Sequence, residues 1–328
     1  MSNPAPFAEI WRGDLLESVH MGHAVICGAD GQIVESWGDP DLVMYPRSSA
    51  KMIQALPLLE SGAADAAGLT AEHLALACAS HQGAAIHTDR VNAWLAAQGL
   101  SDADLRCGAQ TPSDSAARKA LIRADAPACQ CHNNCSGKHT GFLTLARHLG
   151  TDLEYLAIDH PVQRACLEAF ERVTQETSPT WGIDGCSAPN FACSLTGMAR
   201  AMAHFAAAAE DTAQAKLHQA MRLHPDLVAG DGRACTELMQ ATGGKVALKT
   251  GAEGYFIAIL PDQKMGIALK AACGTTRAAE CAIAALLVRL GALDAAHPAT
   301  LKRMNAPITN WRGTKTGVLK PAAGLLRT

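Results

Sequence analysis

The sequence predicts an α+β protein in which both ends of the chain build one antiparallel sheet and the middle of the chain is helical. At the N-terminal end, Ser18–Cys27 and Gln32–Trp37 flank Asp30-Gly31, a good hairpin turn. Near the other end, three short segments alternate or run apolar and predict adjacent strands: Lys245–Lys249, Tyr255–Leu260 and Met265–Ala271. We expect one domain over residues 1–328, with a sheet lobe at about 1–45 and 245–328 and a helical lobe at about 46–244.

The composition narrows the class of protein. Hydrophobic residues make up 48% of the 328 positions, enough for a large core. A net charge of −3 gives no electrostatic case for binding nucleic acid or an anionic membrane. No apolar run reaches the ~20 residues that span a bilayer, and Met1–Glu9 has neither the basic head nor the apolar core of a signal peptide. We therefore expect a cytoplasmic enzyme or binding protein without a nucleic-acid or membrane partner.

Helical patterns fill the segment between the predicted strands. A buried helix is expected to begin near Ser48 and to end or kink at Pro57. Further helices are expected at Thr70–Ala79, Ala84–Ala97, Gly137–Leu149, His160–Glu176, Phe191–Ala209 and Arg277–Leu290. The last segment, Ala295–Thr328, reads as an extended tail.

Ser48 and Lys51 are the first candidates for chemistry. They lie in Y-P-R-S-S-A-K (residues 45–51), just before the apolar Met52 and Ile53. Residues three apart on a helix share a face, so the amine is predicted to reach the hydroxyl. The positive end of a helix dipole favours charge developing on such a serine. The alternative interpretation is an N-cap serine followed by a solvated lysine.

A Lys-Thr-Gly triplet occurs twice in the chain. Lys249-Thr250-Gly251 ends a predicted strand that a hairpin follows, whereas Lys315-Thr316-Gly317 lies in the predicted tail and is interpreted as surface. The order S-x-x-K then K-T-G is similar to the motif skeleton of serine β-lactamases and penicillin-binding proteins.

Cysteines suggest a metal site. The chain has twelve, and four ligand-type residues cluster in one short segment. From spacing alone, zinc is predicted at Cys129, Cys131, His132 and Cys135. The other cysteines in apolar segments are expected to fill the core.

Five blocks together resemble the rhizobial type of L-asparaginase, sometimes called class 3. They are R-S-S-A-K (47–51), S-H-Q-G (80–83), H-N-N-C-S-G-K-H (132–139), G-I-D-G-C (182–186) and K-T-G-A-E-G (249–254). The resemblance runs from about Ser18 to the tail, and the block at 132–139 is the most specific part of it.

The resemblance implies a β-lactamase/glutaminase-like fold, a homodimer, and hydrolysis of L-asparagine to L-aspartate and ammonia. It implies two catalytic pairs, Ser48 with Lys51 and Ser80 with Lys249. It also implies one Zn²⁺, held by Cys135, Lys138, Cys186 and water. The residues implied in substrate binding or support are Arg47, His139, Asp184, Thr250 and Gly251.

Hydrolysis of a side-chain amide is acyl transfer, which needs a nucleophile, a base and an acid for the leaving ammonia. We assign the nucleophile to Ser48 and the base to a neutral Lys51, with Ser80 and Lys249 relaying the proton. The roles of the two serines can be exchanged without contradicting the sequence.

Two further readings stay open. One is a glutaminase or another Ser-Lys amidohydrolase, because one methylene in the substrate is worth only about 1–3 kcal/mol of discrimination. The other is a non-catalytic zinc-binding protein in which Cys135 and Cys186 staple the fold.

Overall fold

The computed structural model describes residues 3–326, which form two compact units. One unit combines the chain up to Ser49 with Cys193–Ala207 and everything from Glu237 onward, and we call it the sheet unit. The other combines Ala50–Ala192 with Ala208–Thr236, and we call it the helical unit. The helix Leu195–Ala207 therefore belongs to the sheet unit, although it lies inside the segment expected to be the helical lobe.

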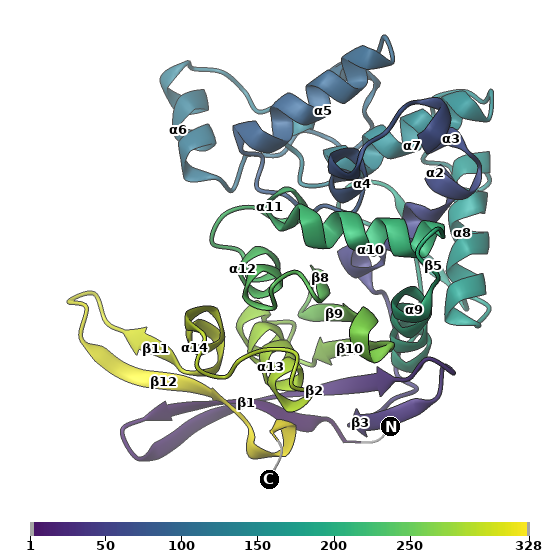
Figure 1. Cartoon of the computed structure of the whole chain (residues 1–328). Helices are drawn as coiled ribbons and strands as arrows, with labels where there is room; N and C mark the ends of the chain where they lie inside the picture. The colour runs from purple at the N-terminus through teal and green to yellow at the C-terminus, as the bar shows by residue number, and fades with distance from the viewer. Residues whose placement is uncertain (1–2, 327–328) are drawn as a thin grey trace. The chain divides into compact units, whose positions relative to one another are not determined.

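The sheet unit is built on one eight-stranded antiparallel sheet (Figure 1). Its strands are β1 (Ala5–Arg12), β2 (Leu15–Cys27), β3 (Ile33–Trp37), β8 (Ala247–Thr250), β9 (Tyr255–Leu260), β10 (Met265–Ala271), β11 (Ala306–Thr309) and β12 (Lys315–Pro321). The strand order is β11-β12-β1-β2-β10-β9-β8, and β3 also pairs with β2. The pairing of β2 with β10 joins the two ends of the chain, which confirms the predicted α+β sheet.

The expectation of an extended tail was wrong, and one strand near the N-terminus was not predicted. The segment expected to be an extended tail contains helix α14 (Pro298–Met304) and the paired strands β11 and β12. Strand β1 was not predicted; its pairing with β2 is interrupted by two register shifts, which blur the alternation of apolar and polar residues.

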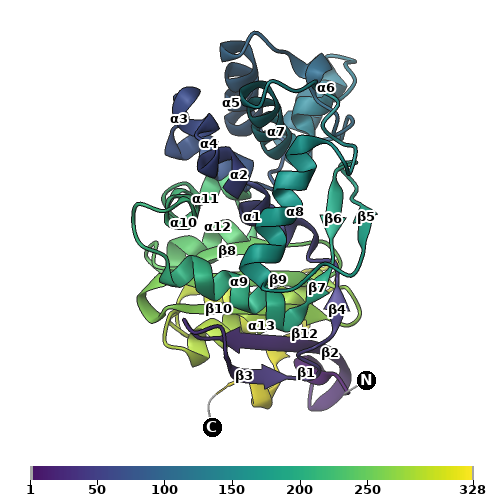
Figure 2. The same ribbon diagram turned by 90° about the vertical axis from the view of Figure 1, so that its right-hand side faces the viewer.

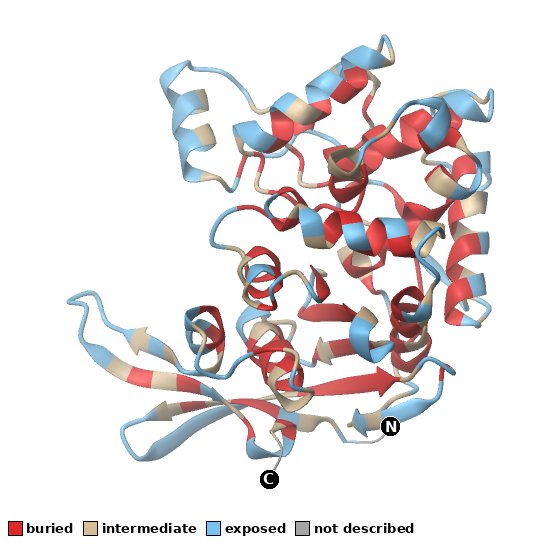
Figure 3. Ribbon diagram, in the orientation of Figure 1, coloured by how far each residue is buried: buried red, intermediate tan, exposed pale blue. Residues whose placement is uncertain are grey.

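Two long helices cover the sheet. Helix α9 (Leu195–Ala207) packs on β2, β9 and β10, and α13 (Thr276–Arg289) packs on β1, β9 and β10 (Figure 2). Every residue of β9 is buried, as the red strands in Figure 3 show. A short two-stranded pairing of β4 (Val43–Met44) with β7 (Cys193–Ser194) leads into α9.

The helical unit is organised around α7 (Ser136–His148). Every residue from Ser136 to Ala146 is buried, and α7 contacts α2, α3, α4, α5 and α8. The other helices are α1 (Lys51–Gln54), α2 (Leu56–Glu60), α3 (Ala63–Ala66), α4 (Ala71–Ala77), α5 (Ala85–Ala97), α6 (Ser115–Arg123), α8 (Pro161–Thr174), α10 (Ala213–Leu223) and α11 (Pro225–Val228). A two-stranded sheet, β5 (Trp181–Ile183) with β6 (Pro189–Phe191), completes the unit. Helix α12 (Ala234–Ala241) begins in the helical unit and ends in the sheet unit.

Short 3₁₀ turns connect several of these elements: η1 (Arg47–Ala50), η2 (Asp102–Asp104), η3 (Gln130–His132), η4 (Pro261–Gln263) and η5 (Ala323–Leu325). Two of them, η1 and η3, carry residues that the sequence singled out. None of the helices in the described part of the chain is long and apolar enough to span a bilayer.

Gly266 sets how closely α9 approaches the sheet. A methyl group at this position would collide with the backbone nitrogen of Ala203 and the backbone oxygen of Ala199, both in α9. We therefore expect Gly266→Ala to lower the free energy of unfolding by at least about 2 kcal/mol, since two backbones would have to separate. Denaturant unfolding of the variant measures this.

Gly324→Ala is the control, because a methyl group there meets no heavy atom within 4 Å. Its stability should stay within about 0.5 kcal/mol of the parent. Equal effects of the two substitutions would contradict this account of the α9 packing.

Candidate active site

The turn that carries S-x-x-K meets the first K-T-G triplet inside the sheet unit. The hydroxyl of Ser49 donates a hydrogen bond to the backbone oxygen of Lys249 at 3.1 Å. A side chain at Gly251 would lie 2.6 Å from the oxygen of Pro46 and 2.9 Å from the Ser49 hydroxyl. Glycine is thus needed at the third position of K-T-G so that the end of β8 can approach this turn.

The two K-T-G triplets differ sharply in burial. Lys249 is 1% exposed and its amine donates to the oxygen of Thr250 at 2.8 Å, whereas Lys315 is exposed on β12. Ser48 is half-buried within η1. Arg47, also half-buried, has a left-handed φ of 53°, an uncommon backbone conformation for a residue with a side chain.

Lys51 begins α1 in the helical unit, and its side chain is almost completely buried at 1% exposure. Its amine lies 3.0 Å from the hydroxyl of Ser80. It also contacts two backbone oxygens, those of Ala79 and, at 3.5 Å, Asn134. The structure therefore brings Lys51 together with Ser80, a residue 29 positions away that spacing rules do not connect.

A neighbouring histidine holds the Ser80 loop in place. His81 is buried, and its Nδ1 accepts the backbone N–H of Gly83 at 3.1 Å. The ring proton must therefore be on Nε2, which donates to the hydroxyl of Ser136 at 2.9 Å. That hydroxyl in turn donates to the oxygen of Cys131 at 2.9 Å. Burial, together with nearby His87 and Lys51, lowers the pKa of His81 well below its usual value, so the ring is neutral.

Cys135, Lys138 and Cys186 converge beneath the start of α7. The amine of Lys138 donates to the Cys186 sulfur at 3.1 Å, and all three side chains are buried. A hydrogen bond from Cys135 outweighs burial and, with the charge of Lys138, holds the pKa of Cys186 well below its usual value. That bond, and then burial, raise the pKa of Cys135 well above its usual value. Burial lowers the pKa of Lys138, but attraction to the two sulfurs is stronger and raises it above the ordinary lysine value.

This donor set suits a thiophilic cation. Sulfur ligands are those zinc prefers, and the lowered pKa of Cys186 favours its thiolate form. Cys135 has a single proton with two acceptors in reach, Cys186 and the side-chain oxygen of Asn134 at 2.9 Å. The amine of Lys138 would have to lose its proton to become a ligand. The two cysteines therefore fit the group that the sequence resemblance implies, whereas Lys138 fits it only after the cation has displaced its proton.

His139 lies beside these ligands. The hydroxyl of Tyr155 accepts the N–H of Arg106 at 2.8 Å and so donates to His139 Nδ1 at 2.9 Å. Burial lowers the pKa of His139 to about 4, which keeps the ring neutral with its proton on Nε2. That Nε2 is buried without a conventional hydrogen-bond partner among residues 3–326, and the Cys186 sulfur is the group that influences it. The partner of the Nε2–H is therefore that sulfur rather than a nitrogen or oxygen.

Asp184 shapes the loop that carries Cys186. Its carboxylate accepts the N–H of Gly185 at 2.7 Å and the amide of Asn190 at 3.4 Å. The side chain is half-buried, so the loop is held while part of the carboxylate stays accessible.

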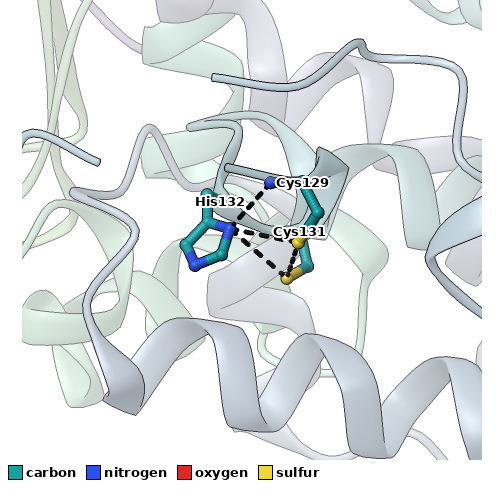
Figure 4. A group of neighbouring side chains, drawn as sticks. All are labelled: Cys129, Cys131 and His132. Carbon is teal, nitrogen blue, oxygen red and sulfur yellow. Dashed lines mark hydrogen bonds between the residues drawn. The ribbon is translucent and has the colours of Figure 1, made fainter. Parts of the chain in front are cut away.

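A separate group of ligand atoms lies in and just before η3. Cys129, Cys131 and His132 each offer one atom, and these three atoms lie within 4.8 Å of one another (Figure 4). This group could hold a metal ion. It contains three of the four residues predicted from spacing, while Cys135 is not a member of it.

Sequence reasoning missed several supporting residues. Ser49, Ser136 and Tyr155 each hold a candidate residue or its segment through a hydrogen bond. Ser49 and Ser136 stand inside the recognised blocks, but only the fold shows what their hydroxyls contact. Tyr155 lies outside every block, and no sequence signal marks it.

A family model described as L-asparaginase II matches residues 8–321 of this chain. The chain belongs to the L-asparaginase II family. It is therefore a hydrolase of this family, as the block at 132–139 and the K-T-G segment predicted. A search of curated proteins found no match.

A comparison with solved structures found distant likenesses, among them β-lactamases. A crystal structure of a β-lactamase from Mycobacterium bovis is 14% identical, with a TM-score of 0.43, and the match covers 79% of this chain and 89% of that one. Mglu in its tris and glutamate form is 12% identical, with a TM-score of 0.49, covering 89% of this chain and 64% of that one. A putative β-lactamase from Bacteroides dorei is 13% identical, with a TM-score of 0.41, covering 76% and 84%. All three TM-scores are below 0.5, so these likenesses support no conclusion about this chain.

The hydrogen bond between Ser136 and His81 should stabilise the folded protein. Ser136→Ala would leave the buried Nε2–H of His81 without its acceptor, a change that costs about 1–3 kcal/mol. We expect the free energy of unfolding to fall by that amount in chemical denaturation.

Thr144→Val serves as the comparison in the same helix. It also removes a buried hydroxyl, but that hydroxyl donates only within α7, to the oxygen of Thr140 at 2.9 Å. A loss for Ser136→Ala no larger than for Thr144→Val would show that the His81 contact is energetically unimportant.

Proposed function

We propose that this protein is an L-asparaginase that hydrolyses L-asparagine to L-aspartate and ammonia through a Ser-Lys acyl-enzyme. Membership of the L-asparaginase II family supports the substrate. The observation that carries the mechanism is the buried amine of Lys51, 3.0 Å from the hydroxyl of Ser80.

The partners of Lys51 suit a general base. A neutral amine has two N–H donors and one lone pair. The oxygens of Ala79 and Asn134 can only accept, so they take the two N–H groups. In the structure the amine donates to the hydroxyl of Ser80 as well. Once the amine has lost one proton, its lone pair is left for that hydroxyl, which can then donate. In this arrangement Lys51 can exchange a proton with the hydroxyl of Ser80, the proposed relay, without help from a histidine.

We retain Ser48 as the proposed nucleophile and Ser80 as the proton relay. Ser48 precedes Lys51 by three residues and is half-buried, while Ser80 is 7% exposed. Attack of the serine oxygen on the carboxamide carbon forms an ester bond and breaks the carbon–nitrogen bond. The proton taken from the hydroxyl passes to the leaving nitrogen, which departs as ammonia. Water then hydrolyses the ester to aspartate and restores the hydroxyl.

Lys249 is the second proposed catalytic lysine, and Arg47, Thr250 and Gly251 are proposed to contact the substrate. Burial of Lys249 and the close approach that Gly251 permits support this proposal, whereas the exposed Lys315 has no comparable surroundings.

Zn²⁺ is the proposed cofactor, and Cys135, Lys138 and Cys186 are the residues that would hold it. When bound, the cation would supply positive charge that orients polar groups of the substrate. Asp184 holds the loop of Cys186, and the Nε2–H of His139 interacts with the sulfur of the same cysteine. We assign His139 and Asp184 to substrate contact or to support of this loop.

We expect Lys51→Met to lower kcat for ammonia release from L-asparagine by at least ~10²-fold, because it removes the base while keeping an apolar stem in the core. Ammonia measured against time, with asparagine and glutamine in parallel, checks this. Near-normal turnover would reject the role of Lys51, and faster turnover of glutamine would reject the assignment of substrate.

Lys315→Met is the matched control, since it removes an exposed lysine from the other K-T-G triplet. It should leave kcat within about twofold.

Mass spectrometry of the quenched, intact protein distinguishes the two serines. The acylated serine is the one whose alanine variant forms no covalent β-aspartyl adduct. An adduct that persists in Ser48→Ala but not in Ser80→Ala would exchange their roles.

Removal of zinc should raise KM more than it lowers kcat. The proposed role of the cation is to orient substrate, and the chain already supplies a nucleophile. Chelation followed by steady-state kinetics, and restoration with Zn²⁺, measure both constants. Complete loss of turnover with unchanged KM would instead indicate a direct chemical role for the metal.

A further inference from the structure

We propose that Cys129, Cys131 and His132 form a second metal site, which takes one thiophilic divalent cation of the zinc class. This site is separate from Cys135, Lys138 and Cys186, which were assigned to the proposed cofactor above. Its support is the convergence of two sulfurs and one imidazole nitrogen within a single short turn.

The three ligand atoms are spaced for one cation. The two sulfurs are 3.1 Å apart, and His132 Nδ1 lies 3.1 Å from the Cys129 sulfur and 4.0 Å from the Cys131 sulfur. Around a tetrahedral zinc ion, with its usual bonds to sulfur and nitrogen, such ligands lie about 3.5–3.8 Å apart. Shifts of roughly half an ångström would therefore be enough to close the site around an ion (Figure 4).

A backbone hydrogen bond shows which nitrogen of the His132 ring can act as a ligand. His132 Nδ1 accepts the backbone N–H of Cys129 at 3.1 Å, so this nitrogen carries no proton. Both sulfurs lie near this nitrogen rather than near the other nitrogen of the ring (Figure 4). A cation would replace the N–H as the partner of the lone pair on Nδ1.

The backbone under the ligands is already fixed. The carboxylate of Asp102 accepts the N–H of Cys131 at 2.6 Å and that of Gln130 at 3.3 Å. The Gln130 side chain donates to the oxygens of Asp102 and Leu105 at 2.9 and 2.8 Å. Little chain entropy remains to be lost when an ion binds, which favours binding.

The surroundings also suit a metal site with three protein ligands and a fourth position that water can fill. Cys131 is buried, and the amide of Asn92 points its N–H at the Cys131 sulfur at 3.9 Å, as an outer donor to a thiolate would. Cys129 and His132 are half-buried, so water can reach the fourth position.

Binding is an exchange of protons for metal. The cation gains two sulfur bonds and one nitrogen bond while the two thiols release two protons, and no oxidant or reductant is needed. The bound ion would tie Cys129 to His132 across η3. This turn leads directly into Asn133 and Cys135, so the ion would stiffen the segment just before the ligands of the proposed cofactor.

Protection of cysteines from alkylation tests the site in the wild-type chain. Reduced, metal-stripped protein is treated with a maleimide, with and without Zn²⁺, and each cysteine is followed by peptide mass spectrometry. We expect Zn²⁺ to slow alkylation of Cys129 at least tenfold. Cys273 is the internal control: it is exposed and has one imidazole, His20 Nδ1, at 3.3 Å, but it does not belong to the metal-ligand group. Its alkylation should not change.

Cobalt provides a second, independent measurement. The Cys135→Ser/Cys186→Ser variant keeps only the proposed second site and should still show a thiolate-to-Co²⁺ charge-transfer band. Cys129→Ser/Cys131→Ser should bind one metal equivalent fewer than the parent. Should either double variant fail to fold, the wild-type alkylation result decides.

Two results would overturn the proposal. One is equal alkylation of Cys129 with and without Zn²⁺. The other is recovery of Cys129 and Cys131 as a disulfide together with unchanged metal content in Cys129→Ser/Cys131→Ser. Neither readout uses asparagine turnover, so the second site and the proposed activity stand or fall separately.

Discussion

The burial of the Lys51 amine is the constraint on which the candidate chemistry depends. A lysine that is 1% exposed is costly unless its nitrogen finds partners. Here those partners are the oxygens of Ala79 and Asn134 and the hydroxyl of Ser80. The loop after α4 and the turn before α7 must both reach Lys51, so the fold of the helical unit and the position of Ser80 are set by the same contacts.

At the start of α7, three more buried polar side chains find partners. Ser136 accepts from His81, Lys138 pairs with Cys186, and His139 accepts from Tyr155. Because these residues lie within one buried helical turn, each polar side chain needs a partner from another segment. The block H-N-N-C-S-G-K-H is therefore dense in polar residues for a structural reason as well as for its proposed chemistry.

Much of the fold could be predicted because it rests on local patterns. The β2–β3 hairpin follows from an Asp-Gly turn between two strand-like segments, and β9 and β10 follow from apolar runs separated by a turn. Strands β1 and β12 were not predicted. They pair with each other although more than three hundred residues separate Ala8 from Pro321, and no local signal reports such a distant partner. The helix α14 was missed in the same region.

The sequence by itself determined the family, the residue types at each block and the presence of ligand-rich segments, because these depend on order along the chain. Tertiary structure decided which atoms meet. It placed Ser80 against Lys51 and separated the buried Lys249 from the exposed Lys315. It also grouped Cys129 and Cys131 with His132 and directed Cys135 toward Cys186. Hydrogen bonds and metal ligation act over about three ångströms, whereas sequence spacing fixes positions to that precision only within a single turn of the chain.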